Sequence, residues 1–185
     1  MTKNKKAAME MSVGTIVTIV LLMMVLVLGI FLIQKIFKSS TGVIDLTDQQ
    51  LREEVNKLFS EDKKLVIYPG TRLVEIKQDE TDGVGVGIKN ILRGSTETTE
   101  FSYVVEVSDP DLNRKCNINE KQAENLIVTG RTETRIPIPS GDKSYQKVLF
   151  EIPVGSPLCT IRYRVNVDAD GVAYATDFFD IKITS

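Results

Sequence analysis

The feature that most constrains this chain is an uncharged run near its start, over residues 11–33. About twenty of these residues are apolar, which is the length that crosses the ~30 Å hydrocarbon layer of a membrane as a single helix. Lysines precede the run, and Gln34 and Lys35 follow it. The sequence therefore predicts a leader at residues 1–12 and a membrane-spanning helix over residues 13–37.

A cleaved secretory signal is the alternative explanation of this run. The apolar part of such a signal is about 7–15 residues long and ends in a small-x-small cleavage site. Here the run is longer, and residues 34–38 contain no Ala-x-Ala, so a retained anchor is favoured. Gly14 and Thr18 form one small-xxx-small spacing, which lets helices approach closely and self-associate, although ordinary membrane-helix composition also explains it.

The charges around the run predict the orientation of the chain. Lys3, Lys5, Lys6 and the α-amino group precede it, against Lys35 and Lys38 after it, and positively charged flanks tend to stay in the cytoplasm. We therefore expect a single-pass protein of the cell membrane with its N-terminus inside and its C-terminal domain outside. Beyond residue 38 the chain has 18 of its 23 basic and 24 of its 25 acidic residues. This acidic balance predicts that nucleic acid is not a partner.

The chain has two cysteines, Cys116 and Cys159, and both follow the predicted span. An even count in an exported domain is typical of a disulfide, whereas in a cytosolic domain buried free thiols would be more common. We expect the disulfide, and closing a loop of this length contributes about 3 to 4 kcal/mol in the chain-entropy model.

Residues 38–63 are predicted to form a hinge and an amphipathic helix. Thr47 and Gln50 have the spacing of a capping box. Apolar residues then recur at helical spacing and form a stripe: Leu51, Val55, Leu58 and Phe59. The surface favoured for this stripe is the domain that follows, and a partner protein or the membrane surface are the alternatives.

From Lys64 onward the apolar pattern has a period of two, with turn residues every eight to twelve positions. Many short strands without intervening helices predict a mainly β fold, an antiparallel immunoglobulin-like β-sandwich over residues 64–185. The expected strands are 64–67, 72–77, 83–91, 101–107, 126–129, 134–138, 147–152, 160–167, 172–176 and 178–183. In the strand at 160–167, one face is apolar and the other carries Arg162, Arg164 and Asn166.

The chain contains no histidine and no tryptophan. The lack of histidine removes Ser-His-Asp and Cys-His catalysis, histidine-ligated zinc and the commonest general base near neutral pH. A Ser/Lys dyad is formally available, but no local pattern singles one out. The sequence predicts neither an enzyme nor a cofactor.

Three segments resemble binding motifs at first sight. Residues 83–87 read Gly-Val-Gly-Val-Gly, but no helix start follows to receive a phosphate, so a strand with a face of small residues is favoured. Asp168-Ala169-Asp170-Gly171 lacks the further ligands of a calcium loop and is typical of a hairpin turn. For the acidic clusters at 79–82 and 109–111 the alternative is an ion at one end of the sandwich, and solvated loops are favoured. No metal site is predicted.

The segment from Lys5 to Val17, Lys-Lys-Ala-Ala-Met-Glu-Met-Ser-Val-Gly-Thr-Ile-Val, resembles the N-terminus of archaeal type IV pilin-like proteins with class III signal peptides. The resemblance implies cleavage after Ala7 on the cytoplasmic face, a mature chain beginning at Ala8, and a filament core built from the apolar helix. Glu10 would then be third in the mature chain, where many pilins have glutamate fifth. Ala7 also stands where glycine is commoner.

The C-terminal region resembles immunoglobulin-like domains of archaeal and bacterial surface proteins, on Tyr68-Pro69-Gly70, Gly87-Ile88-Lys89-Asn90 and Phe150-Glu151-Ile152-Pro153-Val154. The resemblance mostly reports the fold. The function that we expect is that of a membrane-anchored domain with a structural or binding role in the cell envelope, with the lipid bilayer and an envelope protein as partners. The alternatives are a pilin-like filament subunit that polymerises through its N-terminal helix and a membrane-tethered enzyme.

Overall fold

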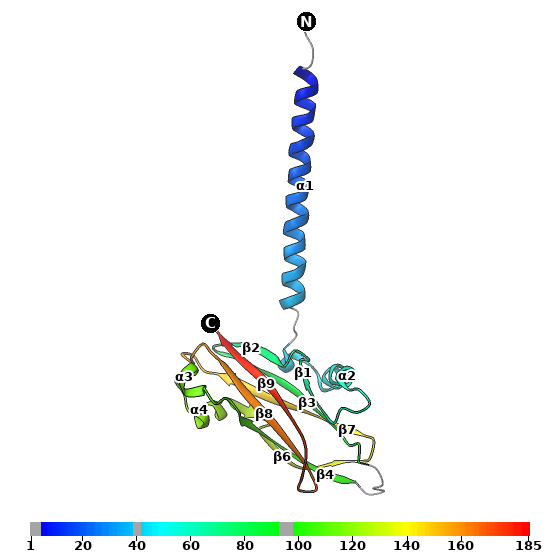
Figure 1. The fold of residues 1–185 in the computed structure, drawn as a ribbon, viewed down its shortest axis with the longest axis vertical. Helices are drawn as coiled ribbons and strands as arrows, with labels where there is room; N and C mark the ends of the chain where they lie inside the picture. Colours follow the sequence, from blue (N-terminus) through cyan, green and yellow to red (C-terminus); the bar gives the residue numbers. More distant parts are fainter. Residues whose placement is uncertain (1–4, 39–41, 93–97) are drawn as a thin grey trace. The chain divides into compact units, whose positions relative to one another are not determined.

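The computed structural model describes residues 5–38, 42–92 and 98–185, and the side chains of residues 5–13 and 33–38 lie outside that description. The chain divides into two units, Met1–Thr41 and Gly42–Ser185. The described residues of the first unit form one helix, and the second unit is mainly β, as predicted (Figure 1).

The first unit contains α1, a helix over Lys5–Lys38. Its segment Gly14–Leu32 has a mean hydropathy of 3.0, and none of that segment is buried inside the protein. The Thr18 hydroxyl donates to the Gly14 carbonyl at 2.8 Å, which satisfies this polar group within the helix. By length and composition the segment fits a membrane anchor or a signal sequence.

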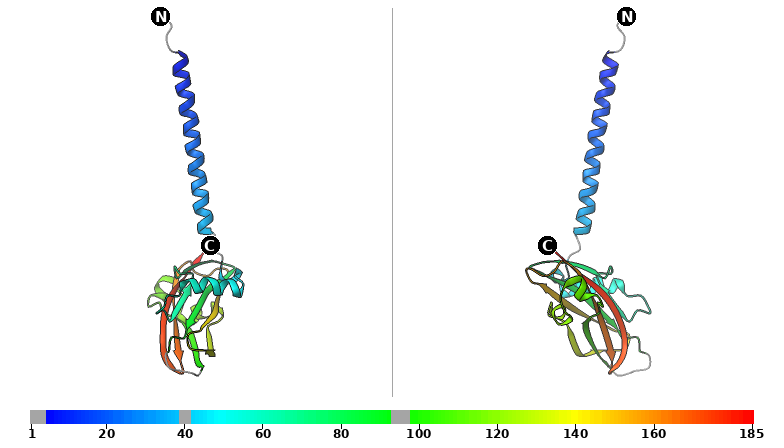
Figure 2. Two further views of the ribbon diagram at one scale, coloured as in Figure 1. Left: turned by 90° about the vertical axis from the view of Figure 1, so that its right-hand side faces the viewer. Right: turned by 60° about the vertical axis from the view of Figure 1, so that its left-hand side comes forward.

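The second unit is a sandwich of two β-sheets, seen as two layers in Figure 2. The first sheet has the order β1-β3-β7-β5 and consists of Leu65–Tyr68, Glu80–Lys89, Lys143–Ile152 and Ile127–Thr129. The second has the order β2-β9-β8-β4-β6 and consists of Leu73–Lys77, Val172–Thr184, Thr160–Ala169, Thr99–Val107 and Thr132–Ile138. In immunoglobulin domains, strands A-B-E-D form one sheet and C-F-G the other. The orders β1-β3-β7-β5 and β4-β8-β9 correspond to these, so the sandwich is immunoglobulin-like.

The sandwich is antiparallel as predicted except at one edge, where β2 pairs with β9 in parallel. The chain crosses from the first sheet to the second at residues 69–72 and reaches the second sheet beside its C-terminal strand. A strand that is not joined to its neighbour by a hairpin can pair in either direction. A two-residue period of apolar side chains shows which face of a strand is buried, and it carries no information on whether the strand pairs in parallel or antiparallel.

The facing layers of the two sheets enclose the main core. On β8 the predicted apolar face is confirmed, because Ile161, Tyr163, Val165 and Val167 are all buried. The rings of Phe150, Tyr163 and Phe179 pack together with centroid separations of 4.9–5.9 Å. The two strands predicted at 172–176 and 178–183 are one continuous strand, β9, because Asp177 stays in the ladder opposite Val165.

A second, smaller core lies under helix α2, Asp48–Leu58. The predicted capping box between Thr47 and Gln50 is confirmed. The buried side chains of Leu51 and Val55 pack over Gly85 of β3, so the glycine-rich segment is a strand with a small-residue face, as predicted. The compact unit therefore begins at Gly42, with the short helix η1 (Val43–Asp45), and not at the start of the strands.

Two short helices between β4 and β5 were not predicted. They are α3 (Leu112–Cys116) and α4 (Glu120–Glu124). Each has only five residues, which is too short for a helical apolar period to be recognised. Asn119 and Gln122 form a capping box at α4, and this was the available sequence signal.

Candidate functional site

The structure joins Cys116, the last residue of α3, to Cys159, the residue before β8, with a Cα–Cα distance of 5.6 Å. The predicted disulfide is therefore present. The residues of the predicted leader cleavage, Ala7, Ala8 and Glu10, lie in α1, and their side chains are outside the described set. Cleavage stays a prediction.

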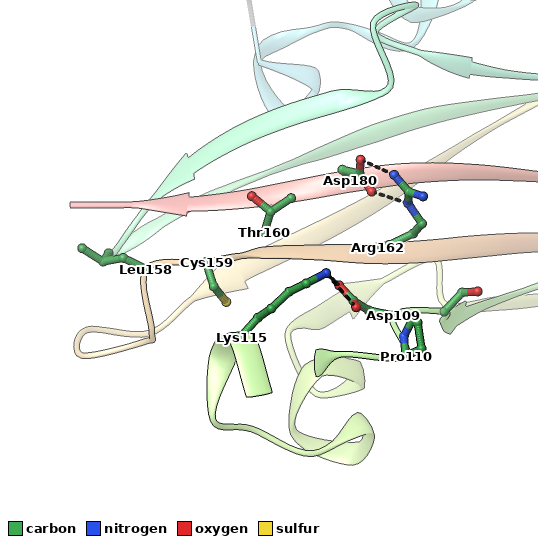
Figure 3. Close-up of a pocket in the computed structure, with 9 residues that line it drawn as sticks. Asp109, Pro110, Lys115, Leu158, Cys159, Thr160, Arg162 and Asp180 are labelled. Atoms are coloured by element: carbon green, nitrogen blue, oxygen red, sulfur yellow. Dashed lines mark hydrogen bonds and ion pairs between the residues drawn. The ribbon is translucent and has the colours of Figure 1, made fainter. Parts of the chain in front are cut away.

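A groove of about 620 Å³ lies beside the disulfide, between the segment that follows β4 and the neighbouring strands β8 and β9. Figure 3 shows two pairs of charged side chains in it, Asp109 with Lys115 and Arg162 with Asp180. Pro110, Leu158 and Thr160 complete the part of the wall that carries no charge. This groove is the candidate functional site in the described part of the chain.

Asp109 forms the inner wall of the groove. Its side chain is only 5% exposed and accepts hydrogen bonds from Lys115 Nζ at 3.2 Å and from the Asp111 backbone N–H at 3.0 Å. Burial alone would raise the pKa of this carboxyl, but these hydrogen bonds and the Lys115 charge outweigh it, so the pKa lies below its usual value. The interpretation of residues 109–111 as a solvated loop is therefore wrong for Asp109, because a cation and backbone N–H groups compensate its burial.

Arg162 and Asp180 form the outer wall. They lie opposite each other on β8 and β9, with Arg162 Nε and an Nη donating to the two Asp180 oxygens at 2.8 and 3.0 Å. The sequence placed Arg162 on the polar face, but its partner depends on the β8–β9 register. The groove thus holds two cations and two carboxylates that neutralise one another, and it offers polar contacts.

The other acidic segments stabilise the local backbone. Asp82 accepts hydrogen bonds from the Gly83 and Ile44 backbone N–H groups at 2.8 and 3.3 Å and thereby joins β3 to η1. Burial raises the pKa of the Asp82 carboxyl, so this part of the 79–82 cluster is not the solvated loop that was expected. The predicted turn at 168–171 is confirmed, with Asp170 and Gly171 at φ values of 49° and 77°. Among the side chains that the structure describes, at residues 14–32, 42–92 and 98–185, no three histidine, cysteine, aspartate or glutamate residues gather as metal ligands.

No family model matches the sequence, and no curated protein matches it. Among solved structures, the fold is similar to a CARDB domain from Pyrococcus furiosus, solved in complex with di-metal ions, at 9% identity and a TM-score of 0.39 over 65% of this chain and 87% of that one. A DNA-bound alkylpurine DNA glycosylase, AlkC of Pseudomonas fluorescens, matches at 10% identity and a TM-score of 0.31, over 64% of this chain and 29% of that one. The class 5 fimbriae chaperone CfaA matches at 13% identity and a TM-score of 0.28, over 64% of this chain and 54% of that one. At these values the likeness is no argument for function, and the fold assignment rests on the strand order.

Proposed function

We propose that this chain is a single-pass membrane protein that displays an immunoglobulin-like β-sandwich on the outer side of the cell membrane, with a structural or binding role in the envelope. The observation that carries the proposal is the exposed apolar segment Gly14–Leu32, which precedes a compact, disulfide-linked domain in the same chain. A span of this length remains in the bilayer when it is not cleaved.

The outer location is supported by two independent features. Lysines are more numerous before the span than just after it, which favours an N-terminus in the cytoplasm. The disulfide between Cys116 and Cys159 belongs to an oxidising compartment, because cytosolic thiols are kept reduced. Both features support the proposal that Gly42–Ser185 lies outside.

A binding or structural role is supported by the chemistry of the groove. Its charged side chains, Asp109, Lys115, Arg162 and Asp180, are already paired, so none is left as a base or a nucleophile. Polar recognition of a protein partner in the envelope uses such groups without a reaction. The proposal therefore includes neither catalysis nor a cofactor.

The test is the topology of the full chain in cells. Protease added to intact, right-side-out cells is expected to degrade the β-sandwich while α1 stays with the membrane fraction after alkaline extraction. The mass of the native protein without reductant is expected to show the disulfide. Protection of the sandwich from the protease would refute the outer location, and release of the chain by alkaline extraction would refute the anchor.

A pilin-like filament subunit is the second candidate. The observation in its favour is an exposed apolar face of α1 whose residues recur at helical spacing and suit a neighbouring helix: Ile19, Val20, Met23, Met24, Val27 and Leu28. A filament subunit is expected to lose residues 1–7 and to appear in surface fibres sheared from cells. A simple anchor keeps residues 1–7 and stays in the membrane, so intact mass and shearing separate the two candidates.

A further inference from the structure

The loop between β7 and β8, residues 153–158, presents two large apolar side chains to solvent. Val154 is 75% exposed and Leu158 is 60% exposed. No charged residue occurs from 152 to 161, in a chain of which 26% is charged. In the second unit only Val172, at 69%, is comparably exposed among the large apolar side chains of the described residues.

Hydrogen bonds and the disulfide hold the 153–158 loop in a defined shape. The Ser156 backbone N–H donates to the Pro153 carbonyl at 3.1 Å, and the Gln78 side-chain amide donates to the Ser156 carbonyl. Cys159, directly after the loop, is fixed by the disulfide to Cys116. The exposure of Val154 and Leu158 is therefore built into the fold, and ordering the loop on a surface costs little conformational entropy.

The loop lies at the end of the sandwich where the chain enters from the first unit. At that entry the Ile44 backbone N–H donates to Asp82, in the first residues of β3. Gln78, just before β3, contacts the loop itself. Val172 begins β9, whose last residues lie beside Cys159, so Val172 is at the opposite end, about 40 Å away along a strand of 13 residues.

Chain length limits how far this end can be from the bilayer. The apolar segment ends at Leu32, α1 continues to Lys38, and the second unit begins at Gly42. The six residues after Leu32 extend the helix by about 9 Å. Four further steps, at most about 3.5 Å each, bring the limit to roughly 23 Å. The headgroup layer takes up about 5 to 8 Å of that distance.

We propose that the 153–158 loop inserts Val154 and Leu158 into the interfacial layer of the membrane that α1 spans, and so contacts the lipid surface directly. The inference rests on the anchor part of the proposed function. An uncharged loop loses no charge hydration on entering the interface, and its apolar side chains leave water. The segment between Leu32 and Gly42, which we call the tether, keeps the loop at a high effective concentration near the lipid. Two apolar side chains are therefore enough for the loop to stay in contact with the lipid surface.

The lack of tryptophan in the chain gives the experiment a silent background. The full chain is reconstituted as Val154→Trp, and separately as Val172→Trp, in vesicles of phosphatidylcholine and phosphatidylglycerol with and without bromine on the acyl chains. Both positions are exposed, so neither tryptophan disturbs the core. Because tryptophan at headgroup level is reached by the quencher, Val154→Trp is expected to lose at least about twofold more emission than Val172→Trp, with a maximum at shorter wavelength.

The outcomes separate the loop from the anchor. If both variants float with the vesicles and are quenched equally, the loop inference is overturned and the anchor stands. If the chain does not float with the vesicles, both are overturned. If bromine has no effect but the Val154→Trp emission shifts as the protein-to-lipid ratio rises, a second copy of the chain covers the loop and the lipid assignment is wrong.

Discussion

Gly85 of β3 is the position at which one added methyl group should report on the docking of α2. A Cβ built there lies 2.5 Å from Leu51 Cδ1 and 3.3 Å from Val55 Cγ2. Both distances are shorter than van der Waals contact, so α2 or the Leu51 side chain must move in Gly85→Ala. Leu51 is only 2% exposed, which leaves little free space for that movement.

The expected magnitude combines two effects. Overpacking a well-filled core costs about 1 to 3 kcal/mol. Replacing a strand glycine by alanine raises the free energy of unfolding by about 0.5 to 1 kcal/mol, because the unfolded chain then has less conformational freedom. Gly85→Ala should therefore lower the free energy of unfolding by about 1 kcal/mol. Leu51→Ala, which empties a buried site in the smaller core, should lower it by about 2 to 3 kcal/mol.

The double variant, Gly85→Ala with Leu51→Ala, decides whether the two sites contact each other. The new methyl group at 85 enters the space that the leucine side chain leaves, so the double variant should be about 1 to 2 kcal/mol more stable than the sum of the single effects predicts. Urea unfolding of the full chain in a mild nonionic detergent, followed by circular dichroism, measures all four proteins of the cycle. Additivity within about 0.3 kcal/mol would refute the packing of α2 over this glycine.

Three further predictions concern the core, the groove and the disulfide. Tyr163→Phe should lower the free energy of unfolding by about 1 to 2 kcal/mol, because the buried Tyr163 hydroxyl donates to a main-chain carbonyl at 2.9 Å. Tyr103→Phe should be neutral or stabilising, because the buried Tyr103 hydroxyl has no hydrogen-bond partner among the described residues. Equal losses of stability in urea unfolding would contradict this difference. Asp109 has a depressed pKa in the folded state, so its contribution to stability is present near neutral pH and is lost as the pH falls below 3.8. The difference in free energy of unfolding between the parent protein and Asp109→Asn should therefore disappear on acidification. A difference that stays constant with pH would refute the assignment. Cys116→Ser with Cys159→Ser should lower the thermal midpoint of the full chain by roughly 10 °C, and a midpoint unchanged by reductant in the parent protein would argue against the bridge.

The period of the apolar residues was enough to predict the class of fold. Alternation at 161–167 identified the buried face of β8, and the glycines at 83–87 identified a face without side chains. Both signals are local, because a strand shows its burial in its own sequence. The pairing partners are not local, so the parallel contact of β2 with β9 had no sequence signal at all.

The charged groove shows the same limit more sharply. Arg162 was visible as a polar-face residue, and Asp109 as one member of an acidic pair. The pairing of Arg162 with Asp180 depends on the β8–β9 register, and the burial of Asp109 depends on α3, a helix too short to be predicted. The 153–158 loop was detectable as an uncharged run, but only the structure shows that its two large side chains point away from the core.

The docking of α2 and of η1, which share the smaller core, also sets the length of the tether, and this links the glycine face to the membrane-contact proposal. With α2 in place, four steps of chain separate Lys38 from Gly42. If α2 leaves the sheet together with η1, which the Ile44–Asp82 hydrogen bond joins to β3, residues 42–64 join the tether, and a flexible segment of that length has a root-mean-square span of about 25 Å by itself. The effective concentration of the loop at the lipid then falls steeply with tether length.

Gly85→Leu tests this link, because a leucine side chain at 85 and α2 compete for the same space. Combined with Val154→Trp, the substitution should reduce quenching by brominated lipid toward the level of Val172→Trp. The disulfide and the far-ultraviolet β signal should persist, because the main core lies between the sheets and not under α2. Undiminished quenching alongside a demonstrated release of both α2 and η1 would mean that lipid contact does not depend on a short tether, and that the apolar loop alone holds the domain at the surface.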